Sequence, residues 1–512
     1  MFETLDKKRI VKNTFFLYFR MLFTMLVALY TSRIVLKVLG IEDYGLYQTI
    51  GGIVGILSFL NGALANASSR YLTFELGKNN SDRLNKVFST ILSFHVLLAI
   101  LVIVIAETVG LYCFFNVLNI PENRLDITFW VYQFSIVTTV ILITQVPYTA
   151  FIIAREKMKV YAYVSIIDVS FKLAIVYILM ISAMDKLLFY SGLLCLVQFI
   201  IAMFYRFYCI KEFSETRYKF VFEKSLAKDI SIFSGWSLLS NLSTILNNQG
   251  IIILLNIFFT PVVVSARAIS IQVNMAVNQF VENFRMAVNP QIVKTYAQNK
   301  YDESQQLVLE SAKISFFLVL LIGFPIILNV DYILGLWLVQ VPHYTSEFVK
   351  LIIIQSLFQS VDTSLYYGLY AKGVIRQNSL LSPIIGILGF PICYILFKIG
   401  ASPLALSWCY IIIFAFLAIV IKPFLLWKLV GYSYKRILKT FFRCGIVSVV
   451  AICIYLLQNY LLPFNRTITL LLFTVTVNTI IMVVSMYYWG LETPVREQLC
   501  AFIKVQISNC KK

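Results

Sequence analysis

Long apolar stretches, separated by short polar connections, run along the chain from residue 12 to residue 490. Each is about 20 residues long, which is enough for a helix to cross about 30 Å of hydrocarbon. There are about 14 of them, at residues 12–32, 44–66, 87–112, 127–152, 160–181, 187–208, 230–259, 262–289, 308–330, 348–371, 379–398, 403–427, 440–461 and 467–489. The pattern predicts an all-α integral membrane protein with about 14 transmembrane helices.

The longest polar connection, at residues 206–229, follows the sixth predicted helix and divides the chain. It predicts an N-terminal lobe at residues 1–218, a C-terminal lobe at 219–432 and two further helices with a tail at 433–512. An even number of helices gives both lobes the same orientation in the membrane, as in transporters with a central midplane site. We therefore expect two six-helix lobes around a central cavity.

Composition and charge exclude a soluble protein. Of 512 residues, 60% are hydrophobic and 13% are charged, whereas soluble proteins have about 25% charged residues. The net charge of +18 does not indicate nucleic-acid binding, because the 43 basic residues gather in alternate connections. About 32 fall on one side of the membrane and about 7 on the other, and this bias predicts that both termini are cytoplasmic.

Four predicted helices carry a polar stripe. At about 100° per residue, the eighth helix places seven polar residues within about 60° of one line along its surface: Arg267, Ser270, Asn274, Asn278, Glu282, Arg285 and Asn289. Shorter stripes include Arg20 in the first helix, Asn241 and Asn248 in the seventh, and Gln355, Gln359 and Asp362 in the tenth. Polar residues in a membrane usually face the bundle interior or a cavity. We expect these helices to border an aqueous space, although hydrogen bonds between helices are an alternative use for such stripes.

The other helices differ in this respect. The third, ninth, twelfth and fourteenth helices are nearly continuous Leu, Ile, Val and Phe, which suits contact with lipid or tight packing.

The charged residues inside these helices fall into two groups. Asp168 and Lys172 are spaced i,i+4, and Glu282 and Arg285 are spaced i,i+3, so each pair can meet on one helix face. Arg20 and Arg267 have no acid within one turn, and an uncompensated guanidinium in a membrane favours a cavity that holds an anion. Asp362 either pairs with one of these arginines or carries a coupling proton, and the sequence leaves both open.

Motifs for enzymatic chemistry are missing from the sequence. It has no GxxxxGK[ST] loop, no HExxH and no G-x-S-x-G, and only two histidines. The nine cysteines lie singly without metal-ligand spacing. We therefore expect neither an enzyme nor a metal site, and no cofactor, with coupling to H⁺ or Na⁺ left open.

Residues 33–47 read RIVLKVLGIEDYGLY, and they are followed by Asn61-Gly62-Ala63, Ser69-Arg70-Tyr71 and Glu75-Leu76-Gly77. This segment resembles the amino-terminal signature of the polysaccharide-synthesis flippases. They belong to the multidrug/oligosaccharidyl-lipid/polysaccharide superfamily and move undecaprenyl-linked O-antigen or capsule units across the bacterial inner membrane. We interpret Gly40, Tyr44 and Gly45 as structural residues that fix the first turn between helices.

The resemblance implies a flippase for polyprenyl-pyrophosphate-linked oligosaccharide in lipopolysaccharide or capsule biosynthesis, working by alternating access in the bacterial inner membrane. Arg20, Arg267 and Arg285 lie in helices where the superfamily places basic cavity residues, and the Asn, Ser and Gln stripes suit the sugars. Membrane lipids, a polysaccharide polymerase and assembly proteins are candidate partners. A cation-coupled multidrug exporter of the same superfamily is the alternative, although that branch places acids in its lobes. A membrane polymerase or ligase fits less well, because the outer loops are short.

Overall fold

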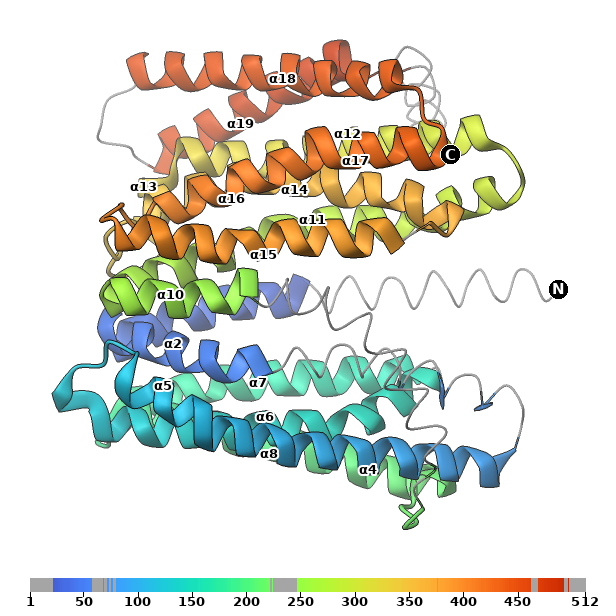
Figure 1. The fold of residues 1–512 in the computed structure, drawn as a ribbon. Helices are drawn as coiled ribbons and strands as arrows, with labels where there is room; N and C mark the ends of the chain where they lie inside the picture. The colour runs from blue at the N-terminus through green and yellow to red at the C-terminus, as the bar shows by residue number, and fades with distance from the viewer. Residues whose placement is uncertain are drawn as a thin grey trace, which may run out of the picture. The chain divides into compact units, whose positions relative to one another are not determined.

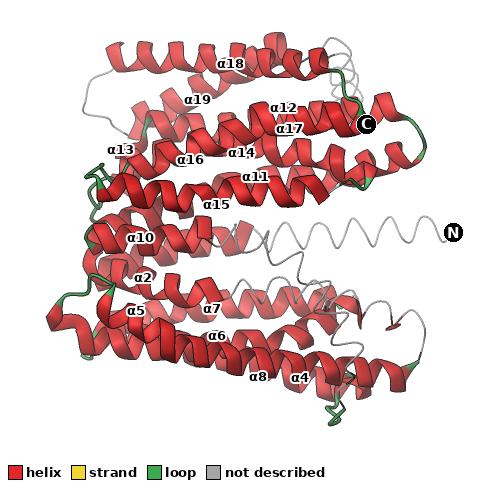
Figure 2. Ribbon diagram, viewed as in Figure 1, coloured by secondary structure: helices red, strands yellow, loops and turns green. Residues whose placement is uncertain are grey.

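The computed structural model describes residues 22–57, 68, 71–72, 75–76, 80–155, 157–221, 223, 246–374, 376–461, 468–491 and 496. Every regular element in these residues is a helix, and none of them forms a strand (Figure 2). Ten helices of this part of the chain are long and apolar enough to cross a membrane. The prediction of an all-α, multi-pass membrane protein is therefore confirmed.

The chain forms two compact units. Unit 1 contains Met1–Ala268, Trp337–His343 and Gly386–Pro403, and unit 2 contains Ile269–Leu336, Tyr344–Ile385 and Leu404–Lys512. The lobe boundaries that the sequence places at residues 218 and 432 stay a prediction, as does the cavity between the lobes.

Unit 1 is built around α6 (Leu125–Ala154), which packs against four other helices of the unit (Figure 1). These are α2 (Ile41–Leu57), α4 (Ser81–Ile105), α7 (Met158–Ile181) and α8 (Lys186–Glu212). Its smaller elements are the π-helical turns Ala106–Gly110 and Leu246–Gly250, the 3-10 turns Glu122–Arg124 and Ser214–Thr216, α5 (Leu111–Asn116) and α10 (Ile251–Phe258). The first predicted helix is described from Leu22 to Leu39.

The start of α2 is fixed by two glycines. Gly40 has φ +83°, a left-handed conformation that only glycine adopts without strain, and it separates Leu22–Leu39 from α2. Gly45 packs directly on the first residue of α11 (Pro261–Ala297), and a Cβ atom there would lie 2.1 Å from the Pro261 carbonyl oxygen. Tyr44 is 2% exposed. The structural interpretation of these residues is therefore confirmed.

We expect Gly45→Ala to lower both the abundance and the melting temperature of the protein. The added methyl group meets backbone rather than a flexible side chain, so α2 or Pro261 must move, and overpacking of this kind costs about 1–3 kcal/mol or more. Gly51→Ala is the matched control, because Gly51 lies in the same helix with no atom within 4 Å of the added Cβ. Thermal unfolding in detergent measures both variants, and equal melting temperatures would contradict the prediction.

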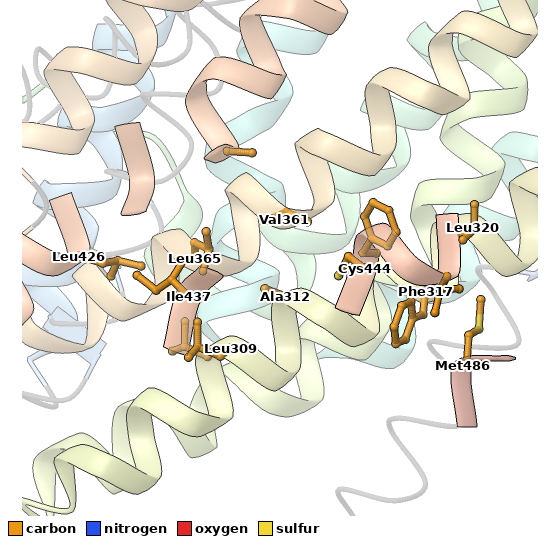
Figure 3. Close-up of a cluster of buried hydrophobic side chains, with 14 of the residues drawn as sticks. Leu309, Ala312, Phe317, Leu320, Val361, Leu365, Leu426, Ile437, Cys444 and Met486 are labelled. Carbon is orange, nitrogen blue, oxygen red and sulfur yellow. The ribbon is translucent and has the colours of Figure 1, made fainter. Parts of the chain in front are cut away.

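Unit 2 packs α12 (Tyr301–Leu328) against α14 (Thr345–Lys372), which also contacts α16 (Ala405–Phe416). After α16 the chain forms α17 (Lys422–Leu425), with the π-helical turns Leu417–Ile421 before it and Leu426–Val430 after it. The last elements are α18 (Tyr434–Leu461), α19 (Ile468–Ser485) and the π-helical turn Met486–Gly490. Figure 3 shows its core, where Phe317 of α12, Leu365 of α14, and Ile437 and Cys444 of α18 come together. Two elements remain: α13 (Val330–Trp337) and α15 (Arg376–Lys398), and both continue into unit 1.

The ninth and twelfth predicted helices, which the sequence describes as nearly continuous apolar residues, each carry one buried lysine. Lys313 of α12 and Lys422 of α17 are 2% and 1% exposed, so each is a buried cation. Lys313 pairs with Glu310 at 2.7 Å, one turn away on the same helix. Both lysines are tolerated because a polar partner compensates the charge, and a hydropathy average hides such isolated residues.

Candidate functional site

Two long helices carry the polar residues of unit 2. They are α11, with 37 residues, of which Ile269–Ala297 belong to this unit, and α14, with 28 residues. Neither is among the ten helices that are apolar enough to cross a membrane by composition. The polar stripes that the sequence predicts on the eighth and tenth helices account for this low hydropathy.

Asn274 and Asn278 of α11 form a hydrogen-bonded network with Ser356 of α14. The Asn278 amide nitrogen donates to Asn274 Oδ1 at 2.8 Å and contacts Ser356 Oγ at 3.2 Å. Ser356 Oγ donates in turn to Asn274 Oδ1 and to the Ile352 carbonyl oxygen at 2.9 Å. The two polar helices therefore contact each other through side-chain hydrogen bonds, which is the alternative role of such stripes.

Two glutamines of α14 lie near Ser356 in the sequence: Gln355 directly precedes it, and Gln359 follows about one helical turn later. Gln355 is 8% exposed, and its Oε1 atom is buried without a hydrogen-bond partner in the described structure. Gln359 is partly buried. A buried amide oxygen that lacks a donor is a group that a ligand hydroxyl can satisfy.

Asp362 of α14 forms a buried ion pair with Lys422 of α17. Lys422 Nζ lies 3.2 Å from Asp362 Oδ1. It also donates to Asn378 Oδ1 and, at 2.9 Å, to Ser382 Oγ, both in α15. The ammonium nitrogen is 5.8 Å from the centre of the Tyr366 ring. The partner of Asp362 in the described structure is thus a lysine, and the carboxylate, the amide and the hydroxyl together compensate its charge.

Arg285 and Glu282 of α11 do not form the ion pair that their i,i+3 spacing allows: within the described residues no contact of 4.0 Å joins them. Arg285 is 9% exposed, whereas Glu282 is exposed. Residues three apart on a helix are separated by about 60° around its axis, so one side chain can turn into the packed interior while the other stays outside. The close ion pair is therefore not formed between these two described residues, and Glu282 acts on the buried Arg285 only through a longer-range charge interaction.

Unit 1 has a polar cavity of about 590 Å³, open to the outside, between α6, α7, α8 and the helix Leu22–Leu39. Asp168 and Lys172 line it and form the expected i,i+4 ion pair at 2.8 Å. On the facing helices, Gln198 donates to Gln145 Oε1 at 3.0 Å. Thr24 belongs to the same lining.

Arg267, near the start of α11, is another predicted site residue that belongs to unit 1. It is 3% exposed.

Three predicted residues cannot be placed. Arg20 and Asn241 lie outside the described residues, and Asn248 lies in the π-helical turn Leu246–Gly250, where its own side chain is not described.

The side chains at these polar sites that escape the stripe pattern include Gln145, Asn378, Ser382 and Lys422. Lys422 is a charged residue inside a predicted span, and that alone could have indicated it. Gln145, Asn378 and Ser382 had no comparable signal, because single neutral polar residues are common in membrane helices.

The fold is similar to those of several transporters of known structure. The lipid II flippase MurJ, in an inward closed conformation, has a TM-score of 0.70 at 11% identity, over 91% of this chain and 97% of that one. An inward-facing multidrug resistance MATE family transporter of the MOP superfamily has 0.65 at 13%, over 81% and 98%. A MOP superfamily transporter from Pyrococcus furiosus has 0.56 at 14%, over 81% and 94%.

The sequence narrows this class further. Residues 10–296, more than half of the chain, match the model of the polysaccharide biosynthesis protein family. The protein belongs to that family, which confirms the resemblance carried by residues 33–77. No curated protein sequence matches the chain.

Proposed function

We propose that this protein is a flippase that moves a polyprenyl-pyrophosphate-linked oligosaccharide from the cytoplasmic to the periplasmic leaflet of a bacterial inner membrane. The observation that carries the proposal is α11, a polar helix with two buried arginines, Arg267 and Arg285, in a member of the polysaccharide biosynthesis protein family. Guanidinium groups bind phosphates with directed hydrogen bonds. The amides of Asn274, Asn278 and Gln355 offer donors and acceptors for sugar hydroxyls.

The charge balance supports this substrate over a cationic drug. Of the three acids among the predicted site residues, Asp168 and Asp362 are each paired with a lysine, and Glu282 is exposed on α11. A paired carboxylate has little charge left for a second cation, whereas Arg285 has no matching pair with Glu282. The described polar residues therefore favour an anionic ligand over a cationic one.

The proposed cycle is alternating access, in which the pyrophosphate and glycan enter from the cytoplasmic leaflet and leave to the periplasmic leaflet. Both termini would lie in the cytoplasm, and a polysaccharide polymerase would receive the exported unit. We propose no cofactor, and H⁺ or Na⁺ is the candidate coupling ion.

Native mass spectrometry of protein purified from its host in mild detergent tests the substrate class. We expect a polyprenyl-pyrophosphate glycan to co-purify with the wild type and to be lost from the Arg267→Gln, Arg285→Gln double variant. Arg436→Gln is the control, because Arg436 is an exposed arginine paired with Asp302 at 2.8 Å. An adduct kept equally by the double variant would contradict the anion-binding role, and small cationic compounds bound in its place would favour a drug exporter.

A further inference from the structure

A second hollow lies in unit 1, apart from the polar cavity. It has a volume of about 710 Å³ and is bounded by α4, α6, α8 and the segment 213–221 that follows α8. Most of its lining is apolar: Val96, Leu97 and Ile100 of α4 face it with Tyr218 and Phe220. Phe220 is 95% exposed and Leu97 is 59% exposed, so the hollow opens to the outside of the unit.

One cation lies in this apolar hollow. Arg206 of α8 donates from Nη2 to Thr144 Oγ1 at 2.6 Å. Its Nε atom is buried and has no hydrogen-bond partner in the described structure. A guanidinium has five N–H donors, so most of this group's capacity is left for a ligand in the hollow.

The acids near the end of α8 do not compensate Arg206. Glu215 pairs with Arg155 at 2.6 Å, Glu223 pairs with Arg83 at 2.9 Å, and Glu212 lies 3.9 Å from Lys157. No ion pair within the described residues involves Arg206. A guanidinium beside apolar walls, with the neighbouring carboxylates already paired, calls for an external anion.

The outer wall of the hollow is held in place before any ligand binds. Asn85 of α4 donates to the carbonyl oxygens of Glu215 at 2.8 Å and Arg217 at 2.7 Å. The backbone N–H of Lys219 donates to Ser89 Oγ at 3.1 Å. Tyr218 Oη lies 3.0 Å from Ser93 Oγ. These contacts fix the segment that carries Tyr218 and Phe220 against α4, so little ordering is needed on binding.

We propose that this hollow binds one anionic phospholipid, with its phosphate on Arg206 and an acyl chain along Leu97, Ile100 and Phe220. Arg206 lies six residues before Glu212, the last residue of α8, or about 9 Å along the helix. Tyr148 and Tyr218 line the hollow with Arg206, and tyrosines near the end of an apolar helix are typical of the membrane interface. The site is separate from the polar cavity with Asp168 and Lys172, and it does not depend on which substrate the protein transports.

The test is retention of lipid by the full-length protein, reconstituted in vesicles of phosphatidylcholine with phosphatidylglycerol and then delipidated in mild detergent. Native mass spectrometry counts the lipids that remain. We expect the wild type to keep one phosphatidylglycerol in preference to phosphatidylcholine, and Arg206→Gln to lose that preference by about tenfold or more, the scale of one charge-assisted hydrogen bond. Arg206→Lys should keep part of it, and Arg436→Gln all of it.

Each other outcome overturns the proposal. Equal retention of phosphatidylglycerol by Arg206→Gln and the wild type would show that the guanidinium does not bind the lipid. Equal retention of both lipids by the wild type would show an apolar groove without headgroup selection. Displacement of the lipid by inorganic phosphate alone would assign the site to a free anion. A melting temperature of Arg206→Gln equal to that of the wild type in phosphatidylcholine shows that the variant is folded, and Arg206→Lys supplies the comparison if it is not.

Discussion

Lys422→Met should deplete the membrane of folded protein and lower its melting temperature strongly. Lys422 is 1% exposed and lies 3.2 Å from Asp362, so its removal leaves a carboxylate inside unit 2 without a cation. It also removes the hydrogen bonds that Lys422 donates to Asn378 and Ser382 of α15. Breaking a buried ion pair by removing one partner costs about 3–5 kcal/mol, which is a large fraction of the about 5–15 kcal/mol by which native proteins are stable.

A second substitution separates the buried charge from the lost packing. The double variant Lys422→Met, Asp362→Asn has no unpaired charge in the cluster, and we expect it to regain much of the lost stability. Lys428→Met is the matched control, because Lys428 lies in the π-helical turn that directly follows α17 and is exposed. Protein abundance in membranes and thermal unfolding in detergent measure all three. The prediction fails if Lys422→Met is as stable as Lys428→Met.

The helices were predictable from the sequence because a membrane imposes a simple rule. Backbone groups in hydrocarbon must be paired within the segment, so an apolar stretch of sufficient length is a helix. The prediction of residues 348–371 is close to the observed α14, Thr345–Lys372. The rule predicts the ends of the helices less accurately. For example, α18 begins at Tyr434 instead of residue 440, because the helix continues past the hydrocarbon into a basic, polar first turn. The rule missed α13, which has eight residues.

The site was only partly predictable, for a different reason. Periodicity within one helix identifies residues on one face. This was enough to predict the ion pair of Asp168 and Lys172, because both residues lie on the same helix. It does not identify the neighbour that the face contacts. Lys422 and Asn378 are 44 positions apart in sequence, and no local pattern joins them. The Asn274 and Asn278 stripe was correctly placed on one helix, but its hydrogen bonds to Ser356 depend on how α11 packs against α14.

Arg285→Gln should reduce glycan export severely while the protein stays in the membrane. Under the proposed function, the guanidinium binds a substrate phosphate, and a charge-assisted hydrogen bond contributes about 1.5–3 kcal/mol. Export would therefore fall by about tenfold to a hundredfold. The measurement is surface glycan per unit of membrane protein, in host cells that lack the wild-type gene, together with lipid-linked glycan accumulated inside.

Glu282 provides the matched control for Arg285. It lies one turn away on α11, it is exposed, and it does not pair with Arg285 in the described structure. Glu282→Gln removes a charge of opposite sign from the same helix and should leave export near the wild-type level. Arg285→Lys keeps the charge but loses the planar, bidentate geometry, so its export should be intermediate. If Arg285→Gln and Glu282→Gln reduced export equally, the general polarity of α11 would explain the effect, and the specific phosphate contact would be wrong.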